Sequence, residues 1–199
     1  MTRSIPVQAV PAELTVDDAA HDECGVLGLS TPHGDGVAQL AFFGLFALQH
    51  RGQEAAGIAV SDGKRARVHK EPGLVSTVFS PEALKPLTGY HAIGHTRYST
   101  TGSNAERNIQ PFLVETMHGP LSVAHNGNLV NAHVLRRELL ERGVGLQTSS
   151  DTEVMVHLIA QLMNSGLDLF AALRRAVGRL RGAFAIAVVS AAEPGVIVG

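Results

Sequence analysis

The sequence predicts an α+β fold in which sheets are covered by helices. Strand-like runs come first, at residues 24–29, 92–98 and 121–125; helical periodicity dominates residues 130–182; and a strand-like apolar run returns at 183–189. No segment repeats with a period of about 20–50 residues, which argues against a solenoid. With 199 residues, 45% of them hydrophobic, the chain can bury a sizeable core.

The first half of the chain carries the signals of a helix and a hairpin. Residues 37–50 have a broad apolar face, and Gly52 ends this segment. Residues 56–60 and 66–70 flank Ser61-Asp62-Gly63, a combination that predicts two strands joined by a tight turn.

The second half carries helix boundaries and a final strand. An amphipathic helix is expected at 130–142. The motif Ser150-Asp151-Thr152-Glu153 has the spacing of a capping box and predicts the start of the next helix. Asp168 is a candidate cap for a third helix that ends near Gly182, and residues 195–199 begin another strand.

Composition excludes several classes of function. The formal net charge is −2 and Trp is absent, so neither a basic field nor a stacking surface favours nucleic acid or an anionic membrane. No apolar run approaches the length of about 18 residues that a membrane span needs. A single cysteine excludes an internal disulfide and is consistent with a cytoplasmic protein.

Residues 1–23 are interpreted as a leader that is removed. Two prolines interrupt the segment, acidic residues follow them, and no apolar block is present, so it is not a secretory signal. The proposed domain therefore comprises residues 24–199. Because the sequence stops inside a strand-like run, we expect it to be part of a longer protein.

A metal site is not expected. His91 and His95 have a spacing of four residues, which would bring two ligands together on a helix. The segment from Tyr90 to Tyr98 is predicted to be a strand, however, and on a strand that spacing forms no compact site.

Cys24 is the candidate nucleophile. A lone cysteine is often a small buried hydrophobe, but Cys24 opens a predicted strand directly after the acidic leader. Cleavage of the Glu23–Cys24 bond would give it a free α-amino group, whose pKa is about 7.7–8.0 in model peptides. That amine could take the thiol proton and later protonate the leaving group, so that one residue supplies nucleophile and base.

The segment His125-Asn126-Gly127-Asn128 allows two interpretations. Asn-Gly is a common hairpin turn. The same residues could form an oxyanion hole, because the Asn126 amide and the unobstructed Gly127 N–H can both point at one developing negative oxygen.

Two charged residues also allow two interpretations. Arg97 could be an edge charge that reaches solvent, or a bidentate clamp for a carboxylate. Asp151 could assist a helix N-terminus or hold a substrate ammonium group. A cation, an anion, a thiol and an oxyanion hole together fit an α-amino acid with a side-chain carbonyl.

These motifs resemble the amidophosphoribosyltransferase family of glutamine-dependent glycosyltransferases. The resemblance covers nearly all of the chain after the leader, in the family's order, and residues 49–58 are the most discriminating block against the sugar-phosphate and asparagine amidotransferases. The motifs that carry it are Cys24-Gly25, Gln49-His50-Arg51-Gly52-Gln53-Glu54-Ala55-Ala56-Gly57-Ile58, Gly94-His95-Thr96-Arg97-Tyr98, His125-Asn126-Gly127-Asn128 and Ser150-Asp151-Thr152-Glu153.

The resemblance implies a fold and a reaction. The fold is that of an N-terminal-nucleophile hydrolase, a four-layer αββα sandwich with two antiparallel sheets. Cys24 would attack the glutamine amide and form a thioester, and Asn126 and Gly127 would stabilise the oxyanion.

The resemblance also implies how L-glutamine is bound. Arg97 would hold the substrate carboxylate and Asp151 the amino group, with Thr100 nearby. Arg51 and Gly52 would line the site, Gly52 through a carbonyl near the α-amino group of the nucleophile.

The complete family members contain more than this segment. Their C-terminal phosphoribosyltransferase domain binds phosphoribosyl pyrophosphate with Mg²⁺ and uses the ammonia in purine biosynthesis, and processed members carry a 4Fe-4S cluster. One cysteine cannot hold a four-cysteine cluster, so no cofactor is expected in these 199 residues. A homo-oligomer is expected at full length.

Three alternatives remain at this stage. With the leader attached, Cys24 has an amide nitrogen and no basic amine, so the chain could be an inactive precursor. It could also be a glutamine-binding module, or the glutaminase domain of another class II amidotransferase.

Overall fold

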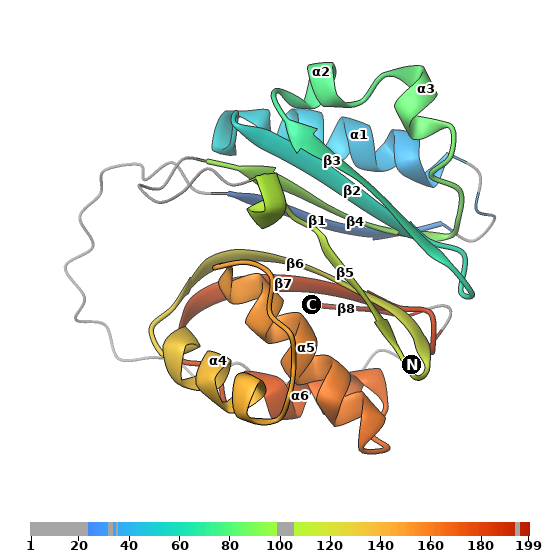
Figure 1. Cartoon of the computed structure of the whole chain (residues 1–199). Helices are drawn as coiled ribbons and strands as arrows, with labels where there is room; N and C mark the ends of the chain where they lie inside the picture. Colours follow the sequence, from blue (N-terminus) through green and yellow to red (C-terminus); the bar gives the residue numbers. More distant parts are fainter. Residues whose placement is uncertain (1–23, 32–33, 35, 99–105, 194–195) are drawn as a thin grey trace, which may run out of the picture.

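The chain folds into four layers, in the order helix, sheet, sheet, helix (Figure 1). The computed structural model describes residues 24–31, 34, 36–98, 106–193 and 196–199. The predicted leader and Thr100 lie outside the described residues. The predicted α+β sandwich of two antiparallel sheets is confirmed.

The first sheet has the strand order β1-β4-β2-β3, with every pair antiparallel. Helix α1 and two one-turn helices lie on its outer face (Figure 1). A short 3₁₀ turn follows α1 in the chain. The bounds are β1 (Gly25–Ser30), α1 (Val37–Ala47), η1 (Gln49–Arg51), β2 (Ala55–Ser61), β3 (Ala66–Pro72), α2 (Val75–Val78), α3 (Pro81–Leu84) and β4 (His91–Arg97).

The second sheet has the strand order β5-β6-β7-β8 and is also antiparallel. Three helices cover its outer face (Figure 1). The bounds are η2 (Glu106–Asn108), β5 (Phe112–Thr116), β6 (Gly119–Leu129), α4 (Ala132–Glu141), α5 (Asp151–Asn164), α6 (Leu169–Val177), β7 (Gly182–Ser190) and β8 (Ile197–Val198).

Three apolar clusters hold the layers together. Large side chains fill the two outer cores, between each sheet and its helices; Leu45 and Ile159, for example, are almost completely buried. The buried core between the sheets is made mainly of small residues, including Ala59, Ala124 and Ala187. Small side chains let the two sheets approach closely along that part of their length.

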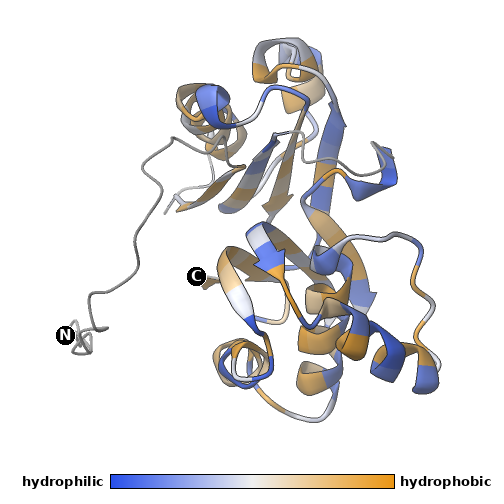
Figure 2. Cartoon of the chain, turned by 90° about the vertical axis from the view of Figure 1, so that its left-hand side faces the viewer, coloured by the Kyte–Doolittle hydropathy of each residue, from blue (hydrophilic) through white to orange (hydrophobic). Residues whose placement is uncertain are grey.

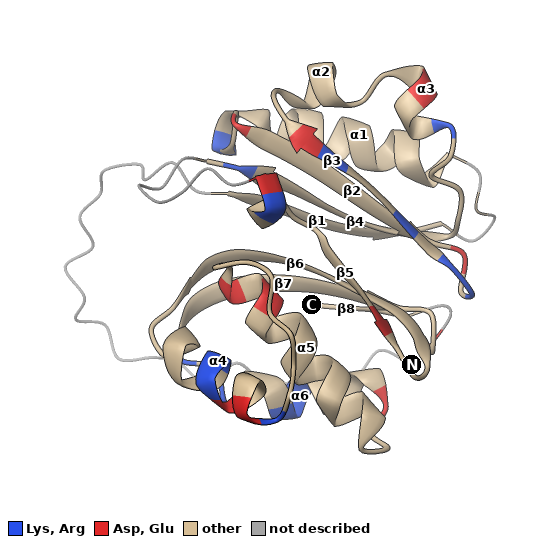
Figure 3. Ribbon diagram, in the orientation of Figure 1, with Lys and Arg blue, Asp and Glu red and all other residues tan. Residues whose placement is uncertain are grey.

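Hydropathy and charge follow this layering. Hydrophobic residues concentrate on the strands and on one side of the covering helices (Figure 2). Lys and Arg are interspersed with Asp and Glu on the outer helices and strand ends, with no large field of one sign (Figure 3). Among the described residues, no helix is long and apolar enough to cross a membrane.

Most predicted elements are present, but two predictions about their bounds are wrong. The hairpin-turn interpretation of residues 125–128 fails because β6 runs through them and β7 pairs with them, from Leu129↔Gly182 to Leu121↔Ser190. The helix capped by Asp168 ends at Val177, before Gly182, because Gly182 already starts β7.

The capping box also differs from the expectation. Ser150 does cap α5, accepting a hydrogen bond from Thr152 N–H at 3.2 Å. Glu153 does not return to Ser150. Its carboxylate instead accepts hydrogen bonds from the backbone N–H groups of Gln147 and Thr148, at 2.7 and 2.9 Å. The loop before α5 is therefore held by the first turn of the helix.

Candidate active site

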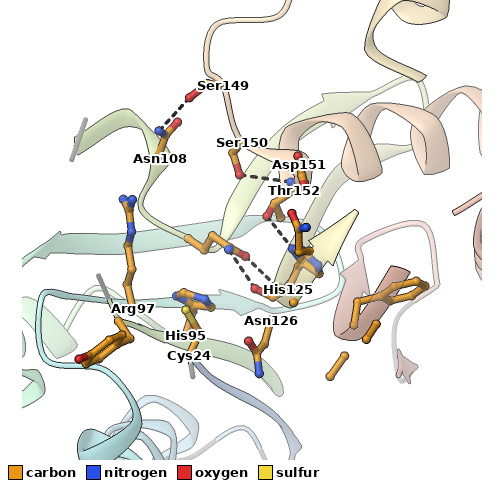
Figure 4. A pocket seen from close by; sticks show the side chains of 17 residues that line it. Cys24, His95, Arg97, Asn108, His125, Asn126, Ser149, Ser150, Asp151 and Thr152 are labelled. Carbon is orange, nitrogen blue, oxygen red and sulfur yellow. Dashed lines mark hydrogen bonds between the residues drawn. The ribbon is translucent and has the colours of Figure 1, made fainter. Parts of the chain in front are cut away.

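A cavity of about 730 Å³ opens between the two sheets, at the end where β1 begins and β4 stops (Figure 4). One wall comes from the first sheet and the other from β6, β7 and the start of α5. The lining residues are Cys24, His95, Arg97, Tyr98, Asn108, Gln110, His125, Asn126, Gly127, Asn128, Ser149, Ser150, Asp151, Thr152, Ala183, Phe184 and Ala185.

Cys24 lies half-buried at the entrance to β1. The next residue, Gly25, donates its backbone N–H to Thr96 Oγ1 at 3.1 Å, and a Cβ on Gly25 would come within 2.6 Å of that oxygen. Arg51 Nε donates to the Cys24 carbonyl at 3.4 Å. Cys24 is thus fixed through its backbone, and the residue lines the cavity.

Arg51 and Gly52 support the cavity from outside its lining. Gly52 packs against the end of β4, where a Cβ would come within 2.6 Å of the Arg97 carbonyl carbon. The Gly52 carbonyl accepts a hydrogen bond from Gln49 Nε2 at 2.7 Å. Gln49 Oε1 in turn accepts the N–H of Val75 at 2.6 Å, which ties the 3₁₀ turn to α2.

Asn126 and Gly127 lie on an open stretch of β6. β5 pairs with β6 only as far as Phe112↔Val123, and no other described strand lies on that side. Gly127 has φ of 127°, a backbone conformation that favours glycine, and a Cβ there would come within 2.2 Å of the Ala183 carbonyl oxygen. Both residues line the cavity at a place where no strand occupies the edge.

Arg97 and Asp151 bring opposite charges to the cavity from different layers. Arg97 is the last residue of β4, and its side chain extends along the wall towards Asn108 (Figure 4). Asp151 is the first residue of α5, and its Oδ2 accepts the N–H of Leu129 at 3.0 Å. Within the described part of the chain the two side chains form no ion pair with each other. The two charges therefore do not neutralise each other.

Two buried histidines line the cavity between the sheets. Burial, together with the neighbouring His125 and Arg97, lowers the pKa of His95 to about 3. Burial also lowers the pKa of His125 to about 4, although the Asp151 carboxylate acts in the opposite direction. His125 Nδ1 lies 3.3 Å from Thr152 Oγ1, whereas its Nε2 and both ring nitrogens of His95 have no hydrogen-bond partner among the described residues. Both imidazoles are neutral at physiological pH.

The described part of the chain has no cluster for a metal. Among the described residues, no group of three or more His, Cys, Asp and Glu side chains could hold an ion. The predicted strand over His91 and His95 is confirmed as β4.

Comparison with known proteins identifies the family. The sequence profile of a family described as a glutamine amidotransferase domain matches residues 95–199, which include most of the cavity lining. The chain belongs to the glutamine amidotransferase family.

The relatives of this glutamine amidotransferase domain confirm the resemblance drawn from its motifs. It is 48% identical to an amidophosphoribosyltransferase of Synechococcus elongatus over 92% of the chain, and 45% identical to one of Methanocaldococcus jannaschii over 83%. The mouse amidophosphoribosyltransferase is 52% identical over 70% of the chain. These alignments span 38%, 35% and 28% of the relatives' own lengths.

Solved structures agree with the sequence relatives. One, described as the allosteric regulatory enzyme of purine biosynthesis, is 42% identical with a TM-score of 0.74. The match covers 82% of this chain and 35% of the chain in that structure. The glutamine phosphoribosylpyrophosphate amidotransferase of B. subtilis, complexed with ADP and GMP, is 40% identical with a TM-score of 0.70. This match covers 85% of the present chain and 35% of the B. subtilis chain. Over most of its length, the chain is therefore similar to one part of these much longer amidophosphoribosyltransferases.

Sequence reasoning missed several residues of this amidotransferase cavity. Gln110 and His125 interact through the His125 backbone, and Asn108 Nδ2 donates to Ser149 Oγ at 3.2 Å across the cavity (Figure 4). No local pattern could reveal these pairs, since their members lie 15 and 41 residues apart in sequence. His95 was considered only as a metal ligand, although a histidine in an apolar strand could have been recognised as a candidate cavity residue.

Proposed function

We propose that the chain, once its leader is removed, hydrolyses L-glutamine to L-glutamate and ammonia through Cys24. One observation carries the proposal: a single cavity is lined by a thiol, by the Asn126-Gly127 pair on an open strand edge, and by a cation and an anion that do not neutralise each other. Membership of the glutamine amidotransferase family supports the same reaction.

The charged residues bind the two charged groups on the α-carbon of glutamine. In this proposal Arg97 forms a bidentate pair with the substrate carboxylate, and Asp151 accepts the ammonium group. The hydrogen bond from Leu129 to Asp151 Oδ2 keeps the carboxylate oriented. Arg51 and Gly52 act from behind the lining, by holding Cys24 and the end of β4. The role expected for Thr100 remains a prediction.

The chemistry proceeds in two displacements at the side-chain amide carbon. Cys24 Sγ forms a bond to this carbon, and the carbonyl oxygen becomes an oxyanion that accepts hydrogen bonds from the Asn126 side chain and Gly127 N–H. Collapse breaks the C–N bond and releases ammonia, which takes up a proton that came from the thiol. Water then attacks the thioester, the C–S bond breaks, and glutamate and the free thiol are formed.

The free α-amine of Cys24 is the best matched base. A general base works best when its pKa lies near the working pH, and an α-amino group titrates at about 7.7–8.0 in model peptides. His95 and His125 line the same cavity, but burial lowers their pKa values to about 3 and about 4, which makes both weak bases. The mechanism therefore depends on cleavage between Glu23 and Cys24.

The ammonia serves a domain outside these 199 residues. We infer that the complete protein transfers it to a phosphoribosyl acceptor in purine biosynthesis, because the relatives named amidophosphoribosyltransferase are much longer than this chain. Mg²⁺ and a 4Fe-4S cluster would belong to that other part, since the single cysteine here cannot ligate a cluster. Assembly into a homo-oligomer and a cytoplasmic location stay predictions.

Replacement of the nucleophile tests the proposal. Glutamate release from L-glutamine is measured for protein whose N-terminus has been shown by mass to be Cys24, and for the Cys24→Ala variant prepared with the same N-terminus. We expect the variant to lose essentially all activity while its melting temperature stays close to that of the parent. Activity retained in the variant would contradict the mechanism.

The precursor and binding-module alternatives have their own signature. The precursor predicts that the purified chain begins at Met1 or Thr2. The binding module predicts that glutamine binds without turnover, even in protein that begins at Cys24. Isothermal titration with L-glutamine, followed by analysis of the products, separates these two from an active enzyme.

A further inference from the structure

The edge of β6 beside the proposed oxyanion hole is completed by a side chain. Two positions before the Phe112↔Val123 pair, the register would bring the backbone of Gln110 opposite His125. The Gln110 side chain takes that place instead. Its Oε1 accepts the His125 N–H at 2.7 Å, and its Nε2 donates to the His125 carbonyl at 2.9 Å (Figure 4). The amide thus bonds the His125 backbone as a neighbouring strand would.

Gln110 is itself held against the first sheet. Its backbone carbonyl packs on β2 so closely that a Cβ on Gly57 would come within 2.0 Å of the oxygen. Lys70 Nζ, from β3, donates to the carbonyls of the residues on either side, Ile109 and Pro111. The same ammonium lies 4.8 Å from the centre of the Phe112 ring. The backbone around Gln110 is therefore anchored on one sheet while its side chain grips the other.

This clamp acts next to the groups that stabilise the oxyanion. Asn126 and Gly127 directly follow His125, and Asp151 holds Leu129 on the far side of them. The open edge is thus fixed at both ends. An oxyanion hole works because its donors are oriented before the reaction, and loss of one donor typically lowers the rate about 10²–10³-fold. A displacement of about 1 Å in catalytic geometry can itself cost about 10²-fold.

We propose that Gln110 is a positioning residue of the reaction: its side-chain amide orients the His125 peptide and, through it, the Asn126 amide and the Gly127 N–H. This inference rests on the proposed glutaminase function. Gln110 lines the cavity but is buried, and both hydrogen bonds of its side chain go to the His125 backbone, so we assign its effect to the orientation of β6.

Two variants of Gln110 and one control test the role. Gln110→Met keeps the length of the side chain and removes both hydrogen bonds. Gln110→Glu keeps an acceptor for the His125 N–H but, when ionised, turns an oxygen towards the His125 carbonyl. Ser122→Ala is the matched control. Like Gln110, Ser122 is buried, and it donates a hydrogen bond to a backbone carbonyl, that of Phe112, at 2.9 Å. Ser122 lies on β6 but does not line the cavity.

The measurements are kcat and KM for glutamine, the rate of Cys24 alkylation by iodoacetamide, and the melting temperature, all on processed protein. Alkylation forms no oxyanion, so it reports the thiol alone. We expect Gln110→Met to lower kcat about 10- to 100-fold, with KM and the alkylation rate within about twofold of the parent. We expect Ser122→Ala to retain the parent kcat. In Gln110→Glu, kcat relative to the parent should recover as the pH falls, because a protonated carboxyl can donate to the His125 carbonyl.

Three outcomes would overturn the inference. The first is a folded Gln110→Met variant with kcat within twofold of the parent. The second is an equal loss of kcat in Ser122→Ala. The third is failure of both Gln110 variants to fold, which would assign the residue to the scaffold. None of these is confused with failure of the proposed function, which would appear as a parent protein that hydrolyses no glutamine.

Discussion

At the scale of single residues, backbone geometry at Gly127 restricts the site most. Its φ of 127° is strained for any residue with a side chain, and the Ala183 carbonyl oxygen occupies the space that a Cβ would need. Because Gly127 has no side chain, its own backbone N–H, which the proposed mechanism uses, is not obstructed by one. The residue's conformation and its function therefore depend on the absence of one carbon atom.

Gly127→Ala should lower both stability and activity. The positive φ alone costs about 1–3 kcal/mol in a residue other than glycine, and the contact with Ala183 adds to it. We expect a lower urea midpoint and at least a 10²-fold loss of glutamine turnover, as for the loss of an oxyanion donor. Gly143→Ala is the control, since Gly143 has φ of 81° but no neighbouring atom within 4 Å of its would-be Cβ. Equal turnover losses in both variants would refute a special role for Gly127.

Asp151→Asn should weaken glutamine binding with little effect on folding. The asparagine carbonyl can still accept the Leu129 N–H, but the negative charge is lost. A hydrogen bond to a charged group contributes about 1.5–3 kcal/mol, which corresponds to a rise in KM of about 10- to 100-fold. Asp168→Asn changes another helix-capping carboxylate, one that bonds Ala171 N–H away from the cavity, and should leave KM unchanged. The same KM in both variants would argue against substrate contact by Asp151.

The sequence was more informative about reactive groups than about their supports. Cys24, Arg97, Asn126 and Asp151 were predicted from their chemistry, and the fold brings all four to one cavity. Gln110 could not be predicted, because its partner is a backbone group whose position depends on the complete sheet. A side chain that bonds distant backbone leaves no periodicity or motif in the sequence.

At the scale of elements, the loop before α5 shows how a local signal can be reinterpreted by tertiary structure. The capping box predicted the start of the helix, and Ser150 caps it. Glu153 bonds the backbone of residues 147–148 because Arg136, from α4, holds the carbonyls of Thr148 and Ser150 and turns the loop towards the helix. The one-turn helices were not predicted, since elements of four residues are too short to show a period, and the strand β5 was also missed.

Glu153→Ala should loosen this loop. Three donors lose their acceptor, namely the N–H groups of Gln147 and Thr148 and the hydroxyl of Thr148. These donors are exposed or only partly buried, so water can replace the lost acceptor, and a hydrogen bond then contributes about 0.5–1.5 kcal/mol net. We therefore expect the free energy of unfolding to fall by about 1–3 kcal/mol. KM for glutamine should rise as well, because Ser149 and Ser150 line the cavity. Urea unfolding and steady-state kinetics provide the two readings, and unchanged values in both would contradict the account.

At the scale of the whole molecule, the two sheets enclose groups that remain neutral. The order of strands and helices along the chain predicted an α+β fold, and the family resemblance implied its αββα layering. The small-residue core between the sheets and the burial of His95 and His125 follow only from how the sheets face each other. Their enclosure links the stability of the sandwich to pH.

Stability should fall as the pH drops below about 6.5. In the folded protein burial lowers the pKa of His95 to about 3 and that of His125 to about 4, from an ordinary value of 6.5. The unfolded chain therefore binds protons first as the pH falls through 6.5, and stability that is present above this pH is lost progressively towards pH 4. The loss should reach several kcal/mol. Urea midpoints measured from pH 7.5 to pH 4.5 should decline throughout this window, and a constant midpoint would show that the histidines are not enclosed.

The central claim is that Cys24 becomes the nucleophile when Glu23 is removed. Intact-mass analysis before and after incubation with an electrophilic glutamine analogue tests it most directly. We predict that a single adduct forms, that it maps to Cys24, and that only polypeptides beginning at Cys24 carry it. An adduct on chains that still begin at Met1 or Thr2, or processed chains that remain unmodified, would contradict the claim.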